Sequence, residues 1–117
     1  MGTFFHRITL IGPTGASETL EAMVDTGAMF TTIPRPVLDR IGVTPFDSIP
    51  VRFANGQTER WPIGQAEAEL NGTKRPILCL FGSVAAPPLI GAHTLEAFLL
   101  TVDPVEHKLV PKEALLM

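Results

Sequence analysis

One acidic residue lies directly after an apolar run early in the chain, in the stretch Val24-Asp25-Thr26-Gly27-Ala28. A carboxylate in this position could accept and donate protons during hydrolysis, because acidic side chains within reach of a reacting group act as general bases and acids. The alternative is that Asp25 only caps backbone N–H groups of its own turn, as aspartate does in many loops. The choice between a catalytic and a structural aspartate therefore depends on the features that accompany it.

The other residues that could do chemistry are isolated in the sequence. His6, His93 and His107 lie far apart with no serine or cysteine motif beside them, so a Ser-His-Asp or Cys-His enzyme lacks support. We interpret the single cysteine, Cys79, as a core residue, with a reactive thiol as the alternative. No cysteine and histidine cluster has zinc spacing, and the glutamates do not have the spacing of a metal loop. We therefore expect no metal and no cofactor.

The length and composition indicate one domain over residues 1–117. A chain of 117 residues can bury one core, and 45% hydrophobic residues exclude a disordered chain. The net charge of −3 without a basic run argues against a nucleic-acid partner. No apolar run is long enough for a membrane helix, and residues 1–5 lack the basic start and apolar block of a signal peptide. We therefore expect a soluble, cytoplasmic protein without a membrane partner.

The pattern of proline, glycine and apolar residues predicts an all-β fold. Eleven prolines and ten glycines indicate many short strands and tight turns. One short helix is expected with Pro36 in its first turn, and a second with Leu95, Phe98 and Leu99 at helical spacing. Alternating apolar and polar residues predict strands over residues 4–11, 18–24, 30–33, 49–54, 57–63, 64–70, 74–81, 100–102 and 107–110.

Three short signals predict how the central strands are joined. Asn55-Gly56 and Asn71-Gly72 both indicate type I′ turns, in which the two central residues need positive φ. Pro76 predicts that its strand begins late or lies at an edge of the sheet, because proline has no N–H group to donate. These signals predict a sheet that continues through two consecutive hairpins.

Three features follow one another along the chain: Asp25-Thr26-Gly27-Ala28 at a strand end, a hairpin with Asn55-Gly56 at its tip, and Leu89-Ile90-Gly91 opening a short helix. Asp-Thr-Gly alone occurs by chance, but the three features in sequence are much harder to obtain by accident. In order and spacing over residues 20–110 they resemble the retropepsin-like (retroviral-type) aspartic proteases, in a cellular or microbial branch. The resemblance implies a small closed β-barrel with a flap hairpin and one or two short helices.

The resemblance also implies roles for the residues of the first and third features. Asp25 would be catalytic, the Thr26 hydroxyl would lock two active-site loops together, and Gly27 would let the loop pass close to the substrate. Ala28 would complete this active-site loop. The segment Leu89-Ile90-Gly91 would brace the loop from beneath.

The hairpin around Asn55 and Gly56 would be a flap that covers the cleft and binds the substrate. Trp61 on one arm of this hairpin either lines a substrate pocket or packs on the neighbouring strand. The charged residues near the tip are Arg52, Glu59 and Arg60. They could select charged substrates, although exposed charges on a hairpin are usually only solvated.

Two departures distinguish this chain from the retroviral members it resembles. Those members usually carry an acidic residue after the alanine and an arginine after the apolar-apolar-glycine segment, whereas this chain has Met29 and Ala92. Both charges are absent together, so neither is left without its partner. The tip of the hairpin has a single glycine, Gly56, where retroviral flaps are glycine-rich. The substrate preference of the viral enzymes therefore does not transfer to this chain.

The number of aspartates with the required context predicts the quaternary structure. An aspartic protease activates water between two carboxylates that share one proton, because like charges at close range cannot both ionise cheaply. Asp39, Asp47 and Asp103 lack a following Thr/Ser-Gly, so none of them is a plausible second carboxylate. We expect Asp25 of a second copy to supply it, in a two-fold homodimer.

The function expected from the sequence is that of an aspartic endopeptidase acting on extended peptide or protein substrates. The alternative is a non-catalytic peptide-binding or dimerisation module with the same fold. A domain processed from a longer precursor is a third possibility, for which the residues give no support. If the dimer resembles that of retroviral members, residues 1–5 and 109–117 would interleave as strands at its interface.

Overall fold

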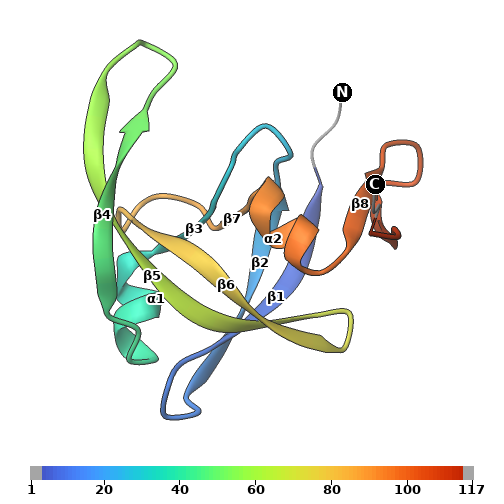
Figure 1. The fold of residues 1–117 in the computed structure, drawn as a ribbon, viewed down its shortest axis with the longest axis horizontal. Coiled ribbons are helices and arrows are strands. Elements are labelled where there is room, and N and C mark those ends of the chain that lie inside the picture. Colours follow the sequence, from blue (N-terminus) through green and yellow to red (C-terminus); the bar gives the residue numbers. More distant parts are fainter. Residues whose placement is uncertain (1–3, 115–117) are drawn as a thin grey trace.

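The computed structural model describes residues 4–114, and they form a mostly β structure with two short helices (Figure 1). In chain order the elements are β1 (Phe5–Ile11), β2 (Ser17–Val24), β3 (Thr31–Pro34), α1 (Arg35–Arg40), β4 (Pro45–Arg52), β5 (Thr58–Leu70), β6 (Thr73–Gly82), β7 (Leu89–Ile90), α2 (Ala92–Ala97), β8 (Leu100–Asp103) and β9 (Lys108–Pro111). The predicted all-β class is confirmed. The prediction of two short helices is confirmed as well.

Seven strands form one sheet that closes on itself. The strand order is β1-β2-β7-β3-β6-β5-β4, and β1 also pairs with β5, so six strands make a ring and β4 lies outside it on β5. The closure is antiparallel, with Leu10 opposite Ala68. Strands β8 and β9 pair separately as a hairpin. The ring-like sheet confirms the small barrel that the sequence predicts.

Alternation along the strands places the core inside this ring. Ile8 and Leu10 of β1 are fully buried, and Ala22 and Val24 of β2 are buried from the adjacent strand, because every second side chain of a strand points to the same face. Cys79 of β6 is also fully buried, and burial raises the pKa of its thiol to about 12. A thiol with so high a pKa is almost wholly protonated at neutral pH, which supports a core role over a reactive one.

The two hairpins predicted to have type I′ turns differ from each other. Asn71 and Gly72 have φ values of 51° and 81°, which confirms the prediction there. At the other hairpin only Gly56 has positive φ, 89°, and its N–H donates to the Phe53 carbonyl. The type I′ prediction for Asn55-Gly56 is therefore wrong. This loop is three residues long, with a tight turn followed by one left-handed glycine.

The side chain of Asn55 gives a physical reason for this difference. Its Oδ1 accepts a hydrogen bond of 2.9 Å from the Gln57 N–H, which is an Asx turn. The extra residue also lets the Phe53 N–H donate to the Gln57 carbonyl at 2.8 Å, so the ladder closes around a wider loop.

Two further expectations, the extent of the second helix and the start of the strand that contains Pro76, differ from the structure. Helix α1 has a proline in its first turn, as predicted, but α2 ends at Ala97. Leu99 has φ of 53° and is 37% exposed, so it belongs to the turn before β8 and not to the helix. Strand β6 begins at Thr73, so Pro76 does not delay it. Pro76 pairs only with β5, because β3 joins β6 from Cys79 onward, and the edge position is confirmed.

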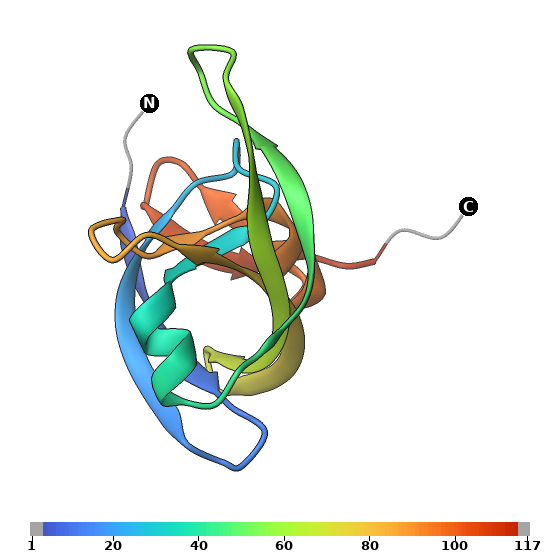
Figure 2. The same cartoon turned by 90° about the vertical axis from the view of Figure 1, so that its left-hand side faces the viewer.

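The β4–β5 hairpin extends beyond the ring (Figure 2). Residues 58–62 of β5 pair with β4 alone, whereas pairing with β6 starts at Ile63. The outer half of the hairpin therefore has no strand of the ring beside it.

Within residues 4–114, neither helix is long and apolar enough to cross a membrane. The cytoplasmic location stays a prediction. The expected terminal strands lie partly outside the described residues.

Candidate active site

Asp25 lies where β2 ends, at the start of a tight turn. Its backbone N–H donates to the Ile90 carbonyl at 3.0 Å, so strand β7 fixes the position of the aspartate. Its carboxylate Oδ1 accepts a hydrogen bond of 2.9 Å from the Gly27 N–H, and its carbonyl accepts one of 3.2 Å from Ala28. The side chain is half-buried and Thr26 is exposed. One carboxylate oxygen is thus oriented by the turn itself.

The rest of the turn is tied to the beginning of α2. The carbonyl of Ala28 accepts a hydrogen bond of 2.8 Å from the Ala92 N–H, and the carbonyl of Met29 accepts one of 2.9 Å from the His93 N–H. The ring of His93 also stacks on Phe30, with centroids 5.1 Å apart and planes 6° from parallel. The first turn of a helix has N–H groups without internal partners, and here two of them hold the loop.

Gly91 is packed so closely against this loop that no side chain fits there. A Cβ atom on Gly91 would lie 2.5 Å from the carbonyl carbon of Phe30 and 2.9 Å from the carbonyl oxygen of Ala28. Its φ of −97° suits any residue, so the requirement for glycine is steric. The segment Leu89-Ile90-Gly91 therefore lies directly against the loop that carries Asp25, in the place that the sequence suggested for a brace.

Two buried threonines join the loop to α2. Thr31 is fully buried and Thr94 is 1% exposed, and their hydroxyl oxygens are 2.6 Å apart. The Thr31 hydroxyl also accepts a hydrogen bond of 3.1 Å from the Gly91 N–H. No pattern in the sequence indicates this pair, because 63 residues separate the two threonines and neither belongs to a motif.

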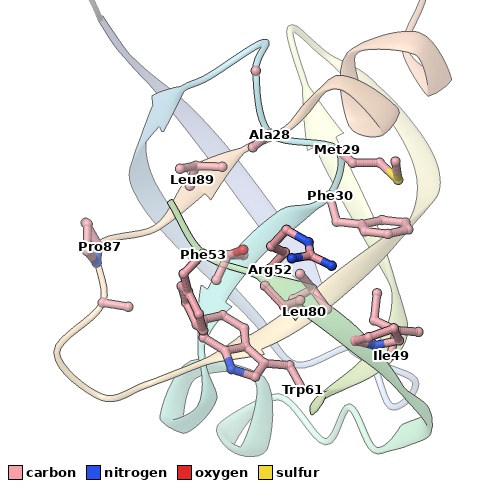
Figure 3. A pocket seen from close by; sticks show the side chains of 15 residues that line it. Ala28, Met29, Phe30, Ile49, Arg52, Phe53, Trp61, Leu80, Pro87 and Leu89 are labelled. Carbon is pink, nitrogen blue, oxygen red and sulfur yellow. The ribbon is translucent and has the colours of Figure 1, made fainter. Parts of the chain in front are cut away.

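A cavity of about 620 Å³ lies beside the turn. Figure 3 shows the side chains around it, which come from the Asp25 loop and β3, from the β4–β5 hairpin, from β6 and from the segment before α2. The lining residues are Gly27, Ala28, Met29, Phe30, Thr32, Ile49, Pro50, Val51, Arg52, Phe53, Trp61, Leu80, Ala86, Pro87 and Leu89. Most of them are apolar, so the cavity suits a large apolar group of a ligand.

The predicted site residues divide into those at the cavity and those away from it. Gly27, Ala28, Leu89 and Trp61 line it. Asn55, Gly56, Ile90, Gly91 and Thr26 do not, and Asp25 lies next to the lining residues without belonging to them. Asn55 instead borders a shallow hollow on the outer part of the hairpin.

Trp61 lies at the cavity and also packs against a neighbouring aromatic ring. Its ring lines the cavity and makes an edge-on contact with Phe53, with centroids 5.8 Å apart. Its Nε1–H donates to the Glu59 carboxylate at 3.0 Å. Trp61 is thus half-buried between a neighbouring aromatic ring and the cavity.

Several wall residues were not identified in the sequence. They include Met29, which is 63% exposed, and Phe30 on the loop, together with Leu80 on β6 and Pro87 after it. One signal was available, since Ile49, Val51 and Phe53 alternate along one arm of the predicted hairpin and therefore share a face. Their position relative to Leu80 depends on the register of β5 with β4 and β6, in which Trp61 lies opposite Ile49 and Ile63 lies opposite Leu80, and on the curvature of the sheet.

Comparisons with known proteins agree with this geometry. Residues 14–97 match the family model described as "gag-polyprotein putative aspartyl protease". The chain therefore belongs to this retropepsin-like aspartic protease family. No curated protein sequence matches significantly.

Solved structures share the fold at low sequence identity. The retroviral protease-like domain of Ddi1 from Leishmania major is 18% identical with a TM-score of 0.62, covering 97% of this chain and 91% of that one. The simian foamy virus protease is 16% identical with a TM-score of 0.58, covering 80% and 92%. A retropepsin-like aspartic protease from Rickettsia conorii is 17% identical with a TM-score of 0.52, covering 88% and 89%. At these identities the similarity establishes the fold.

Proposed function

We propose that residues 1–117 form a single aspartic endopeptidase domain that works as a homodimer, with Asp25 of each copy in one shared site. The observation that carries this proposal is the setting of Asp25. Its carboxylate is oriented by the Gly27 N–H, and its loop is held by Ile90 and by α2 beside an apolar cavity. Membership of the aspartic protease family adds to this support.

The proposed reaction needs two carboxylates that share one proton. The ionised carboxylate takes a proton from a water molecule, and the oxygen of this water attacks the peptide carbonyl carbon. The protonated carboxylate donates its proton to the carbonyl oxygen. The C–N bond then breaks as the departing nitrogen takes a proton from the carboxylate that deprotonated the water. A hydroxyl of the tetrahedral intermediate returns its proton to the other carboxylate as the new carboxyl product forms, so the pair again holds one proton. The pKa values of such a pair belong to both groups together. Thr26, which is exposed, would hydrogen-bond across the two-fold axis.

The substrate would lie extended between the Asp25 loop and the β4–β5 hairpin, which we propose acts as a flap. A peptide in this place can form strand-type hydrogen bonds with backbone groups on either side. Its larger apolar side chains would enter the cavity beside Phe30, Trp61 and Leu89. This arrangement requires no metal, and among the described residues no group of three or more His, Cys, Asp or Glu side chains is placed to hold one.

Replacement of Asp25 by asparagine tests the proposal. We expect the purified wild-type protein to cleave a peptide library at mildly acid pH, and Asp25→Asn to lower the rate about a thousandfold, since acid–base catalysis is worth about that much. The free energy of unfolding should change little, because asparagine can still accept the Gly27 hydrogen bond. Equal cleavage by both proteins would rule out the aspartic mechanism.

Dilution tests the shared site separately. Activity per chain should fall once the protein concentration drops well below the dissociation constant of the dimer, because a monomer holds only one carboxylate. Constant activity per chain would contradict the two-chain site. A wild-type protein that binds peptides without cleaving them would instead be the binding module that is the alternative.

A further inference from the structure

Among the described residues, 4–114, that line the cavity, Arg52 is the only charged one. Figure 3 shows its side chain among Ala28, Phe30 and Leu80, which line the same cavity. The remaining lining side chains are apolar, apart from the Thr32 hydroxyl and the indole of Trp61. A single cation beside an apolar wall creates a specific place for an anionic group of a ligand.

The charge of Arg52 is not neutralised within residues 4–114. The ion pairs there join Arg7 to Glu21, Arg35 to Asp39 and Arg40 to Glu18. The guanidinium of Arg52 makes only one long hydrogen bond, 3.4 Å from Nη1 to the Gly56 carbonyl. Most of its N–H groups are therefore left for another acceptor.

Arg60 on the other arm of the same hairpin is a useful contrast. Its guanidinium donates to the hydroxyl and the carbonyl of Ser48, and it does not line the cavity. Both arginines are exposed. Arg60 is thus engaged on the hairpin itself, whereas Arg52 borders the cavity and keeps most of its N–H groups free.

Building on the proposed peptidase function, we propose that Arg52 makes the site selective for peptides with an aspartate or glutamate next to a bulky apolar residue. The apolar residue would fill the cavity, and the neighbouring carboxylate would accept two parallel hydrogen bonds from the guanidinium. Nearby apolar surface lowers the local dielectric and strengthens this pairing relative to an ion pair in open solvent. Arg52 is then a specificity residue and takes no part in bond cleavage.

The test uses short peptides with a central Leu-Phe pair and one glutamate moved through the flanking positions, each matched to the same peptide with glutamine. At pH 6, where glutamate is ionised, the wild type should show about a fivefold higher kcat/KM for glutamate in at least one position, as expected for a partly exposed ion pair. Arg52→Gln should abolish this preference. Arg52→Glu should reverse the preference, so that a peptide with lysine in that position is cleaved faster than the peptide with glutamate. Arg60→Gln, the matched control, should keep it.

Binding of the same peptides to Asp25→Asn separates the two proposals. The single tryptophan, Trp61, lines the cavity, so its fluorescence reports occupancy without cleavage. A glutamate preference in binding that Arg52→Gln removes supports the role of Arg52 even if the wild type cleaves nothing, in which case only the peptidase proposal fails. Cleavage without a glutamate preference, or a preference that survives Arg52→Gln, overturns the role of Arg52.

Discussion

The cavity has two walls that are built in different ways. The base, residues 25–31 together with 89–94, is held by backbone hydrogen bonds between distant segments and by the buried pair Thr31 and Thr94. The β4–β5 hairpin is exposed over its outer half, and its side-chain hydrogen bonds join residues of the hairpin to one another. The base therefore depends on the whole fold, whereas the hairpin depends mostly on itself.

In the proposed active site, this difference separates the positioning of Asp25 from the recognition of a substrate. A catalytic carboxylate must be held within a fraction of an ångström of its working position, and the hydrogen bonds from the Asp25 loop to β7 and α2 can achieve this. A substrate wall must adapt to varied side chains, and regions with few buried contacts open most readily. Mutations at the base should therefore mainly reduce stability, whereas mutations on the cavity-facing part of the hairpin should mainly change substrate binding.

The largest effect is expected from Gly91→Ala. The new Cβ atom would lie 2.5 Å from backbone atoms of Phe30, so the loop must move, and we expect a loss of about 3 kcal/mol or more in the free energy of unfolding. The matched change on the hairpin is Gly56→Ala, where the space is open and only the φ of 89° is unfavourable. It should cost about 1–2 kcal/mol. Urea denaturation followed by Trp61 fluorescence measures both, and equal costs would contradict the distinction.

The buried hydroxyl pair should give the next effect. Thr31→Val leaves the buried Gly91 N–H without its acceptor and should cost about 1–3 kcal/mol, and Thr94→Val should cost about 1 kcal/mol. The control is Thr19→Val, because Thr9 and Thr19 form an exposed hydroxyl pair at 2.8 Å between β1 and β2. Its effect should stay within about 0.5 kcal/mol. A control as costly as the buried variants would show that burial is not the cause.

The smallest stability effect, with a clear binding effect, is expected from Phe53→Ala on the hairpin. The aromatic contact with Trp61 is worth about 1 kcal/mol, so the protein should stay folded. KM for a cleaved peptide should rise about threefold to tenfold, because part of the cavity wall is lost. Phe46→Ala is the control, since Phe46 is 63% exposed on β4 and does not line the cavity. An unchanged KM for Phe53→Ala would argue against the hairpin as a substrate wall.

Local features were predicted well where local chemistry decides them. The strand that delivers Asp25 follows from simple alternation, and Asn71-Gly72 forms the expected type I′ turn. The prediction was wrong at Asn55-Gly56, where an Asx hydrogen bond competes with the type I′ conformation. It was also wrong at Leu99, which has helical spacing in the sequence but lies in the turn that leads into β8.

The sequence by itself determined the family, the position of Asp25 at a strand end and the glycine that lies against its loop, because each of these depends on a short run of residues. Only the tertiary structure decided which residues form the cavity and which pair locks its base. Phe30, Arg52 and Leu80 come from three segments that the closed sheet brings together. Contacts across such distances depend on the curvature of the closed sheet and on the parallel pairing of β3 with β6, and no short pattern in the sequence encodes either of them.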